Sequence, residues 1–471
     1  MVDTGDPHHP ALSDQALQLL DSLEEYTEDA ADETNITLRK QGWDPQTVAA
    51  VLTQARLRRD ARGKFGDRAE RMLFTPTGLE QATRWPVALR HAERFATAGV
   101  PRVADLGCGL GADAMALAEA GLEVTAVEAD AHTAWIAAHN LAPFPQAEVL
   151  HTTAEQWAAA HGLVRQTDPV PRQEQAQAPW GVWLDPARRN RRSRLWNPEE
   201  FSPPLSFITA VAANGVPLGV KLGPGIPHEV IPADCEAEWV SIDGELVEVV
   251  LWFNALCRRR TLPRHTAGSA PAADSEHSAE PEDTSRLIRR AATVLTSRTT
   301  TPREKQPGPN IQQPNTHHSA ELTSTEDFGS GPEPAPAGPD GLTGVLYEPD
   351  PAVIRAGLVA DLAETWGGRL LDEHIAYFSL PHTSAPAGEA PLARGYRILE
   401  VMPYSPKRLA RWCAEHQITS VEIKKRGVDV VPEQLRSTIL PKKRRGREPR
   451  HAVFILVRIG PERFAAVVEP V

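Results

Sequence analysis

A glycine-rich stretch between a strand-like run and a helix-like run has the composition of a ligand-binding loop. It reads Asp105-Leu106-Gly107-Cys108-Gly109-Leu110-Gly111, after residues 102–106 and before residues 113–120. Glycines there let the backbone approach a ligand closely, and the start of the following helix offers free N–H groups. Glu128 ends the next strand-like run, 21 residues after Gly107, where a carboxylate can accept ribose hydroxyls. The pattern predicts a site for an adenosyl-type cofactor.

Two cofactors fit the glycine spacing alone. Gly107, Gly109 and Ala112 also satisfy the G-x-G-x-x-G/A fingerprint of dinucleotide-binding proteins. Asp105 separates the two, because a carboxylate beside the loop disfavours a pyrophosphate and suits the ammonium of a methionine moiety. S-adenosylmethionine is therefore favoured, with a dinucleotide, or a glycine-rich turn that binds nothing, as alternatives. The predicted cofactor contacts in this region are Asp105, Gly107, Gly109, Gly111 and Glu128.

A second set of polar residues follows later strand-like runs, and ligands of open α/β sheets lie at such strand ends. Asp185 and Pro186 follow the run 181–184, and Lys221 ends the run 217–221. Lys221 has two interpretations, a contact to a substrate phosphate or an ion pair with Asp185. The arginines after Asp185 are dense enough to bind phosphate, although pairing with carboxylates explains them equally well. These arginines are Arg188, Arg189, Arg191, Arg192 and Arg194.

The elements expected around these residues form two folded parts joined by a linker. Residues 1–100 show helical spacing of apolar residues, and over 101–262 strand-like runs alternate with helical ones, which is typical of a doubly wound parallel sheet. Residues 263–342 are rich in Pro, Ser, Thr, Glu and Gly, so we expect a mostly disordered linker, with a helix considered at 285–295. Residues 343–471 are expected to fold as a smaller α+β domain.

Composition narrows the class of protein. No run approaches the roughly 18 apolar residues of a membrane span, and the first residues lack the features of a secretory signal, so we expect a cytoplasmic protein with no membrane partner. The four cysteines form no C-x-x-C pair, which argues against a zinc ribbon or a disulfide frame, and we expect no metal. The formal net charge of −12 disfavours nucleic acid binding over the whole surface. Residues 396–471 nevertheless carry 16 Lys and Arg against 8 Asp and Glu, which leaves a local basic surface.

Residues 75–255 resemble the class I S-adenosylmethionine-dependent methyltransferases, on the glycine-rich loop and the acidic residues around it. The resemblance implies a Rossmann-like domain in which Asp105 and the glycine backbone hold the methionine end of the cofactor and Glu128 holds the ribose. This family often has an acidic residue near the adenine, and here that residue is displaced to Glu155. Glu155 completes the set of predicted cofactor contacts.

The same resemblance concerns the methyl acceptor. Relatives that methylate an amino nitrogen carry Asp or Asn, then two prolines and an aromatic residue, where this chain has Asp185-Pro186-Ala187-Arg188. Stacking on a base must then come from elsewhere, and Phe74 and Trp196 are the candidates. Phe74-Thr75-Pro76 is similar to an element of trimethylguanosine synthase-like RNA methyltransferases, although a plain turn capped by Thr75 or Thr77 explains it nearly as well.

The C-terminal region resembles the THUMP-like domain found behind some bacterial methyltransferases, over the stretches 397–401, 423–428 and 442–447. THUMP domains proper bind RNA, so the resemblance implies an RNA partner. A solvated loop of like charges is the alternative for the densest basic stretch. The predicted RNA contacts there are Lys442, Lys443, Arg444 and Arg445.

Together these patterns predict a methyltransferase that acts on a base in RNA, tRNA or rRNA, held by the C-terminal domain. Asp185 and Pro186 form the predicted catalytic edge, with Asp185 orienting an acceptor amine. Phe74, Arg188, Arg189 and Lys221 are expected to contact the RNA. In-line placement against an activated methyl group needs little acid or base help. Two other functions stay open: methylation of a small molecule or protein, and RNA binding without catalysis. The sequence does not indicate the oligomeric state.

Overall fold

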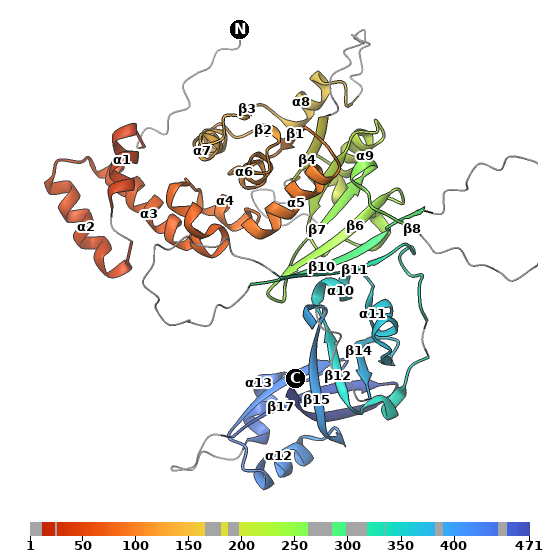
Figure 1. The fold of residues 1–471 in the computed structure, drawn as a ribbon. Coiled ribbons are helices and arrows are strands. Elements are labelled where there is room, and N and C mark those ends of the chain that lie inside the picture. Colours follow the sequence, from red (N-terminus) through yellow and green to blue (C-terminus); the bar gives the residue numbers. More distant parts are fainter. Residues whose placement is uncertain are drawn as a thin grey trace, which may run out of the picture. The chain divides into compact units, whose positions relative to one another are not determined.

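The chain divides into two compact units, which are described separately (Figure 1). Unit 1 comprises residues 1–222, 230–235 and 250–258, and unit 2 comprises residues 223–229, 236–249 and 259–471. The structure is a computed structural model. It describes residues 12–23, 26–164, 180–186, 197–261, 285–297, 318–333, 335–381, 390–440 and 450–471.

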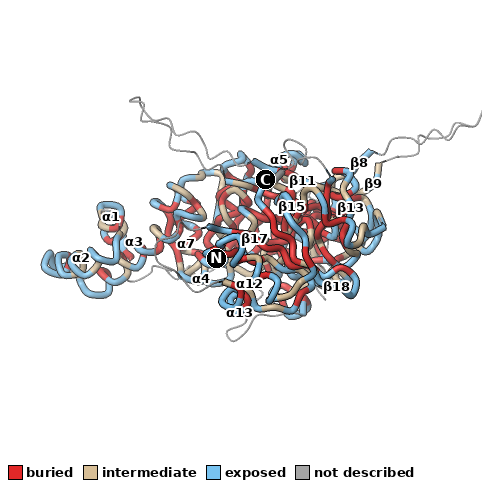
Figure 2. Tube along the Cα trace, turned by 90° about the horizontal axis from the view of Figure 1, so that it is seen from below, coloured by how far each residue is buried: buried red, intermediate tan, exposed pale blue. Residues whose placement is uncertain are grey.

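Unit 1 begins with helices whose starts are set by capping side chains. Ser13, Thr27 and Asp44 each accept a backbone N–H at the start of the first three helices. Thr75 caps the fourth helix in the same way, as the plain-turn interpretation predicted. The second helix buries only Leu38, and Figure 2 shows most of its turns exposed. These helices are α1 (Asp14–Ser22), α2 (Glu28–Lys40), α3 (Pro45–Phe65), α4 (Pro76–Gln81) and α5 (Trp85–Thr97).

Five parallel strands form the sheet of unit 1 in the order β3-β2-β1-β4-β5, with the last part of β7 beside β5. The order reverses at β1, since β2 and β3 lie on one side of it and β4 and β5 on the other. Such a reversal leaves a crevice at the carboxyl ends of β1 and β4, where ligands bind in open α/β sheets. The predicted doubly wound sheet is confirmed. Its strands are β1 (Arg102–Leu106), β2 (Glu123–Glu128), β3 (Ala147–His151), β4 (Trp180–Leu184), β5 (Leu218–Leu222) and β7 (Glu245–Phe253).

Buried aromatic rings form a rigid base beneath the strand ends of unit 1. Trp183 of β4 lies 5.8 Å from Trp252 of β7 between ring centroids, and Phe95 of α5 meets both rings edge-on. All three belong to one apolar core with the inner faces of the helices. This close packing fixes the carboxyl end of β4. The helices between the strands are α6 (Ala112–Glu119), α7 (Ala131–Leu141), α8 (Ala154–Ala160) and α9 (Leu205–Ala212).

Unit 2 contains strands in the segment that we expected to be a linker. β10 pairs in parallel with β6 and antiparallel with β11, and β8 pairs with β9. Buried Arg290 of β10 donates to the carbonyl oxygens of Glu326, Ser330 and Gly357, which anchors the strand. These strands are β6 (Cys235–Ile242), β8 (Arg259–Thr261), β9 (Ser285–Leu287), β10 (Arg290–Thr296) and β11 (His318–Ser324).

The linker prediction is therefore wrong at 285–297 and 318–333, and so is the helix considered at 285–295. The physical reason is a short apolar run, Ala291 to Leu295, that is buried between two neighbouring strands. Composition averaged over some eighty residues conceals a run of five. The rest of the predicted linker up to residue 317, namely 263–284 and 298–317, lies outside the described residues.

The second sheet of unit 2 has the order β13-β14-β12-β15-β18-β17-β16. Only β16 and β17 run parallel among its paired strands. α12 and α13 pack on this sheet through Leu409, Leu435 and Phe454, so the predicted α+β C-terminal domain is confirmed. The strands are β12 (Val345–Pro349), β13 (Arg369–Asp372), β14 (Ile375–Leu380), β15 (Ala393–Pro403), β16 (Ser420–Arg426), β17 (His451–Ile459) and β18 (Glu462–Pro470); the helices are α10 (Pro351–Arg355), α11 (Val359–Trp366), α12 (Pro406–Glu415) and α13 (Pro432–Ile439).

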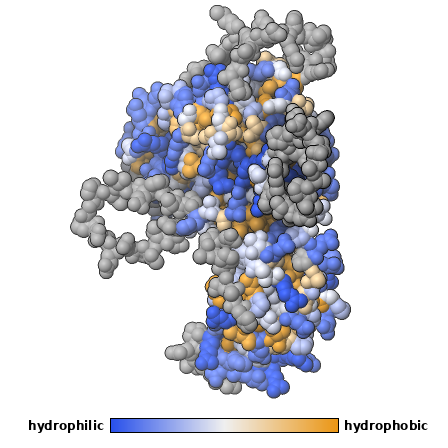
Figure 3. Space-filling model, turned by 45° about the vertical axis from the view of Figure 1, so that its right-hand side comes forward, coloured by the Kyte–Doolittle hydropathy of each residue, from blue (hydrophilic) through white to orange (hydrophobic). Residues whose placement is uncertain are grey.

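Hydrophilic residues cover most of the face drawn in Figure 3, with smaller apolar groups between them. Within the described ranges, none of the helices combines the length and apolar character that crossing a bilayer requires. All four cysteines are free thiols.

Candidate functional site

The glycine-rich loop lies at the carboxyl end of β1, beside the end of β4. Gly107 has φ +87°, and a Cβ there would lie 3.1 Å from the carbonyl oxygen of Asp185. Gly109 has φ +54°, and its N–H points to the carboxylate of Glu128. Side chains at either position would be strained, and at Gly107 would also crowd β4. The two glycines therefore keep the loop tight against the crevice between β1 and β4.

Asp105 is the most unusual group in this crevice. Its carboxylate belongs to a residue that is 1% exposed, and neither oxygen has a hydrogen-bond partner among the described residues. Burial, and then the charges of Asp113 and Asp185, raise its pKa well above the ordinary value for aspartate. A buried carboxylate without a donor is costly, and a cationic ligand would remove that cost.

The charges around the loop fit S-adenosylmethionine and disfavour a dinucleotide. The negative charges of Asp113, Asp185 and Glu128 raise the pKa of Asp105, and the positive charge of Lys221 lowers it. The ammonium of a methionine moiety would meet Asp105 as a favourable counter-charge. A pyrophosphate would instead add negative charge to this cluster.

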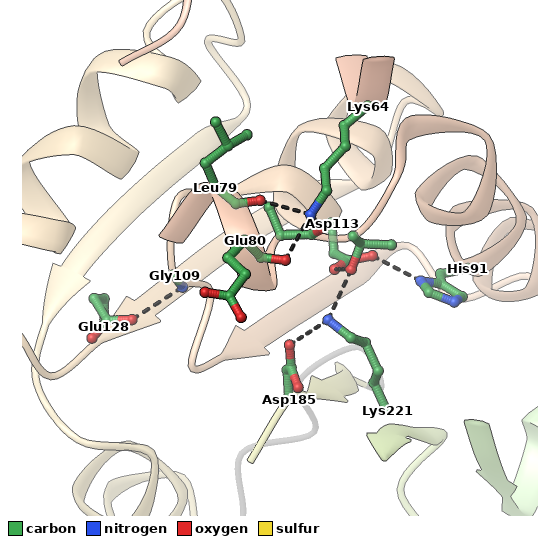
Figure 4. A network of polar contacts seen from close by, with 11 residues as sticks. Lys64, Leu79, Glu80, His91, Gly109, Asp113, Glu128, Asp185 and Lys221 are labelled. Carbon is green, nitrogen blue, oxygen red and sulfur yellow. Dashed lines mark hydrogen bonds and ion pairs between the residues drawn. The ribbon is translucent and has the colours of Figure 1, made fainter. Parts of the chain in front are cut away.

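Glu128 is fixed at the end of β2 by the backbone. Its Oε2 accepts from the N–H of Gly109 at 3.0 Å (Figure 4). Its Oε1 accepts from the N–H of Asp130 at 2.9 Å. Each oxygen keeps a second lone pair, so the carboxylate can still accept ribose hydroxyls. Contact between Glu128 and the ribose stays a prediction. Glu155 lies in the first turn of α8 and is exposed, and its role near the adenine also stays a prediction.

Asp185 lies at the carboxyl end of β4 and pairs with Lys221 of β5. Lys221 Nζ lies 2.5 Å from Asp185 Oδ2, and Figure 4 shows the two side chains pointing toward each other. The side chain of Asp185 is 30% exposed, so a substrate can still reach it, whereas that of Lys221 is 8% exposed. Of the two interpretations of Lys221, the ion pair with Asp185 is the one present, and the buried ammonium does not support a phosphate contact.

Three polar residues that sequence reasoning missed stand behind Lys221. Thr83 Oγ1 accepts from Lys221 Nζ at 3.0 Å and donates to Asp113 Oδ2 at 2.7 Å. The other oxygen of Asp113 lies 2.7 Å from His91 Nδ1. One signal was available in the sequence: Asp113 is the single polar residue of the run from Ala112 to Ala118, and an aspartate in such an apolar helix requires polar partners. The structure buries all seven of these residues.

The other predicted substrate contacts do not join this site. Phe74 is 1% exposed and packs against Phe65 in the core, so its buried ring does not support stacking on a base. The sequence next to Phe74, just before the turn at Thr75-Pro76, gives no indication that this ring is buried. Arg188, Arg189 and Trp196 lie outside the described residues, and so do Lys442, Lys443, Arg444 and Arg445. Pro186 is buried directly after Asp185.

A metal centre is not apparent in the described part of the chain, where no group of three or more His, Cys, Asp or Glu side chains could hold an ion. Cys108 lies in the loop itself. Burial, and then the charges of Asp105 and Glu128, raise the pKa of its thiol well above the ordinary value, so the thiolate is disfavoured.

Comparison with known proteins agrees with this geometry. A protein of Mycobacterium tuberculosis (strain H37Rv) named uncharacterized S-adenosylmethionine-dependent methyltransferase is 28% identical over 421 residues, which are 86% of this chain and 91% of that protein. A crystal structure of a protein provisionally named a methyltransferase, from Porphyromonas gingivalis W83, covers 95% of this chain and 100% of its own, with a TM-score of 0.61 and 16% identity. That likeness shows a shared fold.

Two family models match parts of the chain. Residues 393–470 match the family described as THUMP domain-like, and residues 11–61 match a domain family of unknown function. The first match covers the strands and helices of the C-terminal sheet from β15 to β18. The chain is therefore similar over most of its length to a protein named as an S-adenosylmethionine-dependent methyltransferase, it shares the fold of a structure provisionally named a methyltransferase, and its C-terminal part matches the THUMP domain-like family.

Proposed function

We propose that this enzyme methylates a base in RNA, tRNA or rRNA, and that the C-terminal domain holds the RNA. The observation that carries the proposal is the THUMP-like segment at 393–470, because THUMP domains proper bind RNA. The charge of this region supports it, since residues 396–471 carry 16 Lys and Arg against 8 Asp and Glu in a chain of net charge −12. Local positive charge is what attracts a phosphate backbone.

The described part of the C-terminal domain presents several basic side chains on a rigid support. Lys407 and Arg408 are exposed in the first turn of α12, and Lys425 is exposed on β16. α12 and β16 share one apolar core, which includes Leu409 and Ile423. Exposed basic side chains at fixed backbone positions can contact phosphates, so such a surface suits RNA.

The crevice of unit 1 supports an amine as the acceptor. When bound, S-adenosylmethionine supplies a methyl group already activated on a sulfonium, so the protein contributes mainly placement. Asp185 Oδ2 is held by Lys221, and the partly exposed carboxylate can accept an N–H of the acceptor through Oδ1. That hydrogen bond would aim the nitrogen lone pair at the methyl group. The methyl–sulfur bond would break as the N–C bond forms, a neutral thioether would leave, and the extra proton on nitrogen would pass to Asp185 and from there to solvent. An exocyclic amine of a base has the required N–H.

Mass mapping of nucleosides in RNA from cells with and without the protein tests the proposal. We expect one methylated nucleoside to disappear when the protein is absent, to return with the wild-type chain and to return to a much lower level with Asp185→Asn. A matched control is Glu123→Gln at the amino end of β2, which removes a comparable charge from the opposite end of the sheet and should restore the nucleoside. RNA that is unchanged in every strain would overturn the proposal.

A further inference from the structure

Lys221 is a buried cation that forms an ion pair with the more accessible Asp185. Its side chain is 8% exposed, and its Nζ donates to Asp185 Oδ2 at 2.5 Å and to Thr83 Oγ1 at 3.0 Å. The side chain of Asp185 is 30% exposed, so of the two residues only Asp185 is accessible to a substrate. A buried cation in this place reaches a methyl acceptor through Asp185, whereas its charge also acts on Asp105 from a distance.

The ammonium is itself held by groups from three different elements. Thr83 precedes α5, Asp113 belongs to α6 and His91 to α5, and hydrogen bonds link them in that order behind Lys221. Burial alone would raise the pKa of Asp113, but the hydrogen bond and charge of His91 and the charge of Lys221 lower it below the ordinary value. Asp113 is therefore an anion that attracts Lys221 from behind.

The segment that carries Thr83 is fixed as well. Lys64 Nζ donates to the carbonyl oxygens of Leu79, Glu80 and Ala82, at 2.6, 2.7 and 3.1 Å (Figure 4). These carbonyls belong to the end of α4 and the residue before Thr83, which otherwise lack helical partners. A lysine of α3 thus orders the loop whose hydroxyl contacts Lys221.

We propose that Lys221 is a positioning residue, whose ammonium holds Oδ2 of Asp185 so that Oδ1 faces the methyl acceptor. The inference rests on the proposed transfer to an acceptor oriented by Asp185. Without the ammonium, the carboxylate can rotate about its side-chain torsions and accept water at either oxygen. The acceptor would then bind but spend less time aimed at the methyl group, and turnover rather than affinity would fall.

The test is a mutant cycle on methyl transfer, with saturating cofactor and the acceptor that the wild-type enzyme methylates. Lys221→Met keeps the length of the side chain and removes the charge. We expect kcat at saturating cofactor to fall about 10- to 100-fold, as for loss of a charge-assisted hydrogen bond, with KM for the acceptor within about threefold of wild type. The Kd for the cofactor is measured separately, because the charge of Lys221 also acts on Asp105. Asp185→Asn and the double variant complete the cycle. Because Lys221 acts through Asp185, the double variant should match Asp185→Asn within about threefold.

A second pair of variants keeps the test decisive if Lys221→Met does not fold. Thr83→Ser keeps the hydroxyl that contacts Lys221, and Thr83→Val removes it at similar volume. We expect Thr83→Ser to retain turnover and Thr83→Val to lose about 3- to 10-fold, as for loss of a hydrogen bond to a charged group. Arg102→Met, which breaks a partly exposed arginine–glutamate pair at the amino end of β1, opposite the glycine-rich loop, is the control for general effects of charge removal.

Three results would overturn the proposal. The first is a loss of kcat in the double variant that equals the product of the two single losses. The second is a raised KM with unchanged kcat in Lys221→Met. The third is equal turnover in the two Thr83 variants. A raised KM alone would mean that Lys221 contacts a substrate phosphate. Failure of the wild-type enzyme to label any RNA would overturn only the proposed function, since the cycle can be measured on whichever acceptor is labelled.

Discussion

Asp105 in unit 1 and Glu348 in unit 2 are both carboxylates with little exposure, but only Glu348 is satisfied by its own chain. Glu348 accepts from Lys424 Nζ at 2.9 Å through Oε2 and from the Tyr377 hydroxyl at 3.3 Å through Oε1. Asp105 has no hydrogen-bond donor among the described residues, although it is more deeply buried. A folded chain gains nothing from a buried carboxyl group that lacks hydrogen-bond partners.

The difference indicates that Glu348 stabilises the fold, whereas Asp105 binds a cationic ligand. Replacing Glu348 or its partner should cost stability, whereas replacing Asp105 should cost binding and improve stability. Each of the following experiments would strengthen that distinction or break it.

The largest effect is expected for cofactor binding by Asp105→Asn. Asparagine removes the charge that would meet the ammonium of S-adenosylmethionine in a buried site, where loss of one partner of an ion pair costs about 3 kcal/mol or more. The Kd measured by titration calorimetry should therefore rise at least about 100-fold. Glu348→Gln is the control and should bind the cofactor as wild type does. Equal affinity of wild type and Asp105→Asn would contradict the assignment.

The next effect is expected for turnover by Asp185→Asn. Asparagine can present an N–H where the carboxylate accepted one, so the acceptor loses a charge-assisted hydrogen bond of about 2 kcal/mol. The rate of a single turnover should fall about 10- to 100-fold, with Kd for the cofactor within about threefold. If cofactor affinity fell and the rate did not, Asp185 would belong with Asp105 as a cofactor contact.

The stability of Asp105→Asn should depend on pH in a defined direction. Burial and neighbouring carboxylates raise the pKa of Asp105, so above about pH 4 the unfolded chain releases a proton that the folded chain keeps. The free energy of unfolding of the wild type therefore falls as pH rises, and asparagine removes this loss. Without cofactor, Asp105→Asn should be about 1–2 kcal/mol more stable at pH 8 and equal to wild type below about pH 4. An advantage that shrinks with rising pH would be the wrong sign.

A smaller effect is expected for RNA affinity when Lys442, Lys443, Arg444 and Arg445 are all replaced by alanine. Each lost phosphate contact reduces the salt dependence of binding, so the slope of log K against log salt should become shallower by about 2 to 3. Affinity near physiological salt should fall about 10-fold, with cofactor affinity unchanged. Filter binding over a series of salt concentrations measures both quantities. An unchanged slope would favour a solvated loop of like charges.

The smallest effect is expected for Lys424→Met in unit 2. The pair of Lys424 and Glu348 is partly exposed, with side chains at 20% and 19%, and Arg426 lies 3.8 Å from the other oxygen of Glu348. Loss of the lysine should therefore cost only about 1 kcal/mol of stability. Chemical denaturation of the full chain measures it. Weaker cofactor binding in this variant would remove the contrast between the two clusters.

The contrast also shows which features a sequence can reveal. The run from residue 102 to 128 was predictable, because strand, glycine loop, helix and acid follow one another locally and each obeys its own pattern. The sequence left two interpretations of Lys221, a phosphate contact or an ion pair with Asp185. The ion pair depends on the pairing of β5 with β4, which no local pattern predicts. Thr83 and His91 meet Asp113 only in the folded chain, and no local pattern links them.

Two misjudged regions have a common physical cause. Phe74 was predicted as a base-stacking ring from a short resemblance, and β10 was missed because of the polar composition of the segment around it, whereas the burial of both is decided by distant elements. Phe74 packs on Phe65 of α3, and β10 gains neighbours on both sides from β6 and β11. Tertiary burial of this kind outweighs the local composition.

The central claim is most directly tested by incubating the purified enzyme with methyl-labelled S-adenosylmethionine and total RNA, and then separating RNA, protein and small molecules. The account predicts label in one RNA nucleoside with wild type, and a much slower appearance of the same product with Asp185→Asn. Label that enters protein or small molecules in a cell extract, and never RNA, would contradict it.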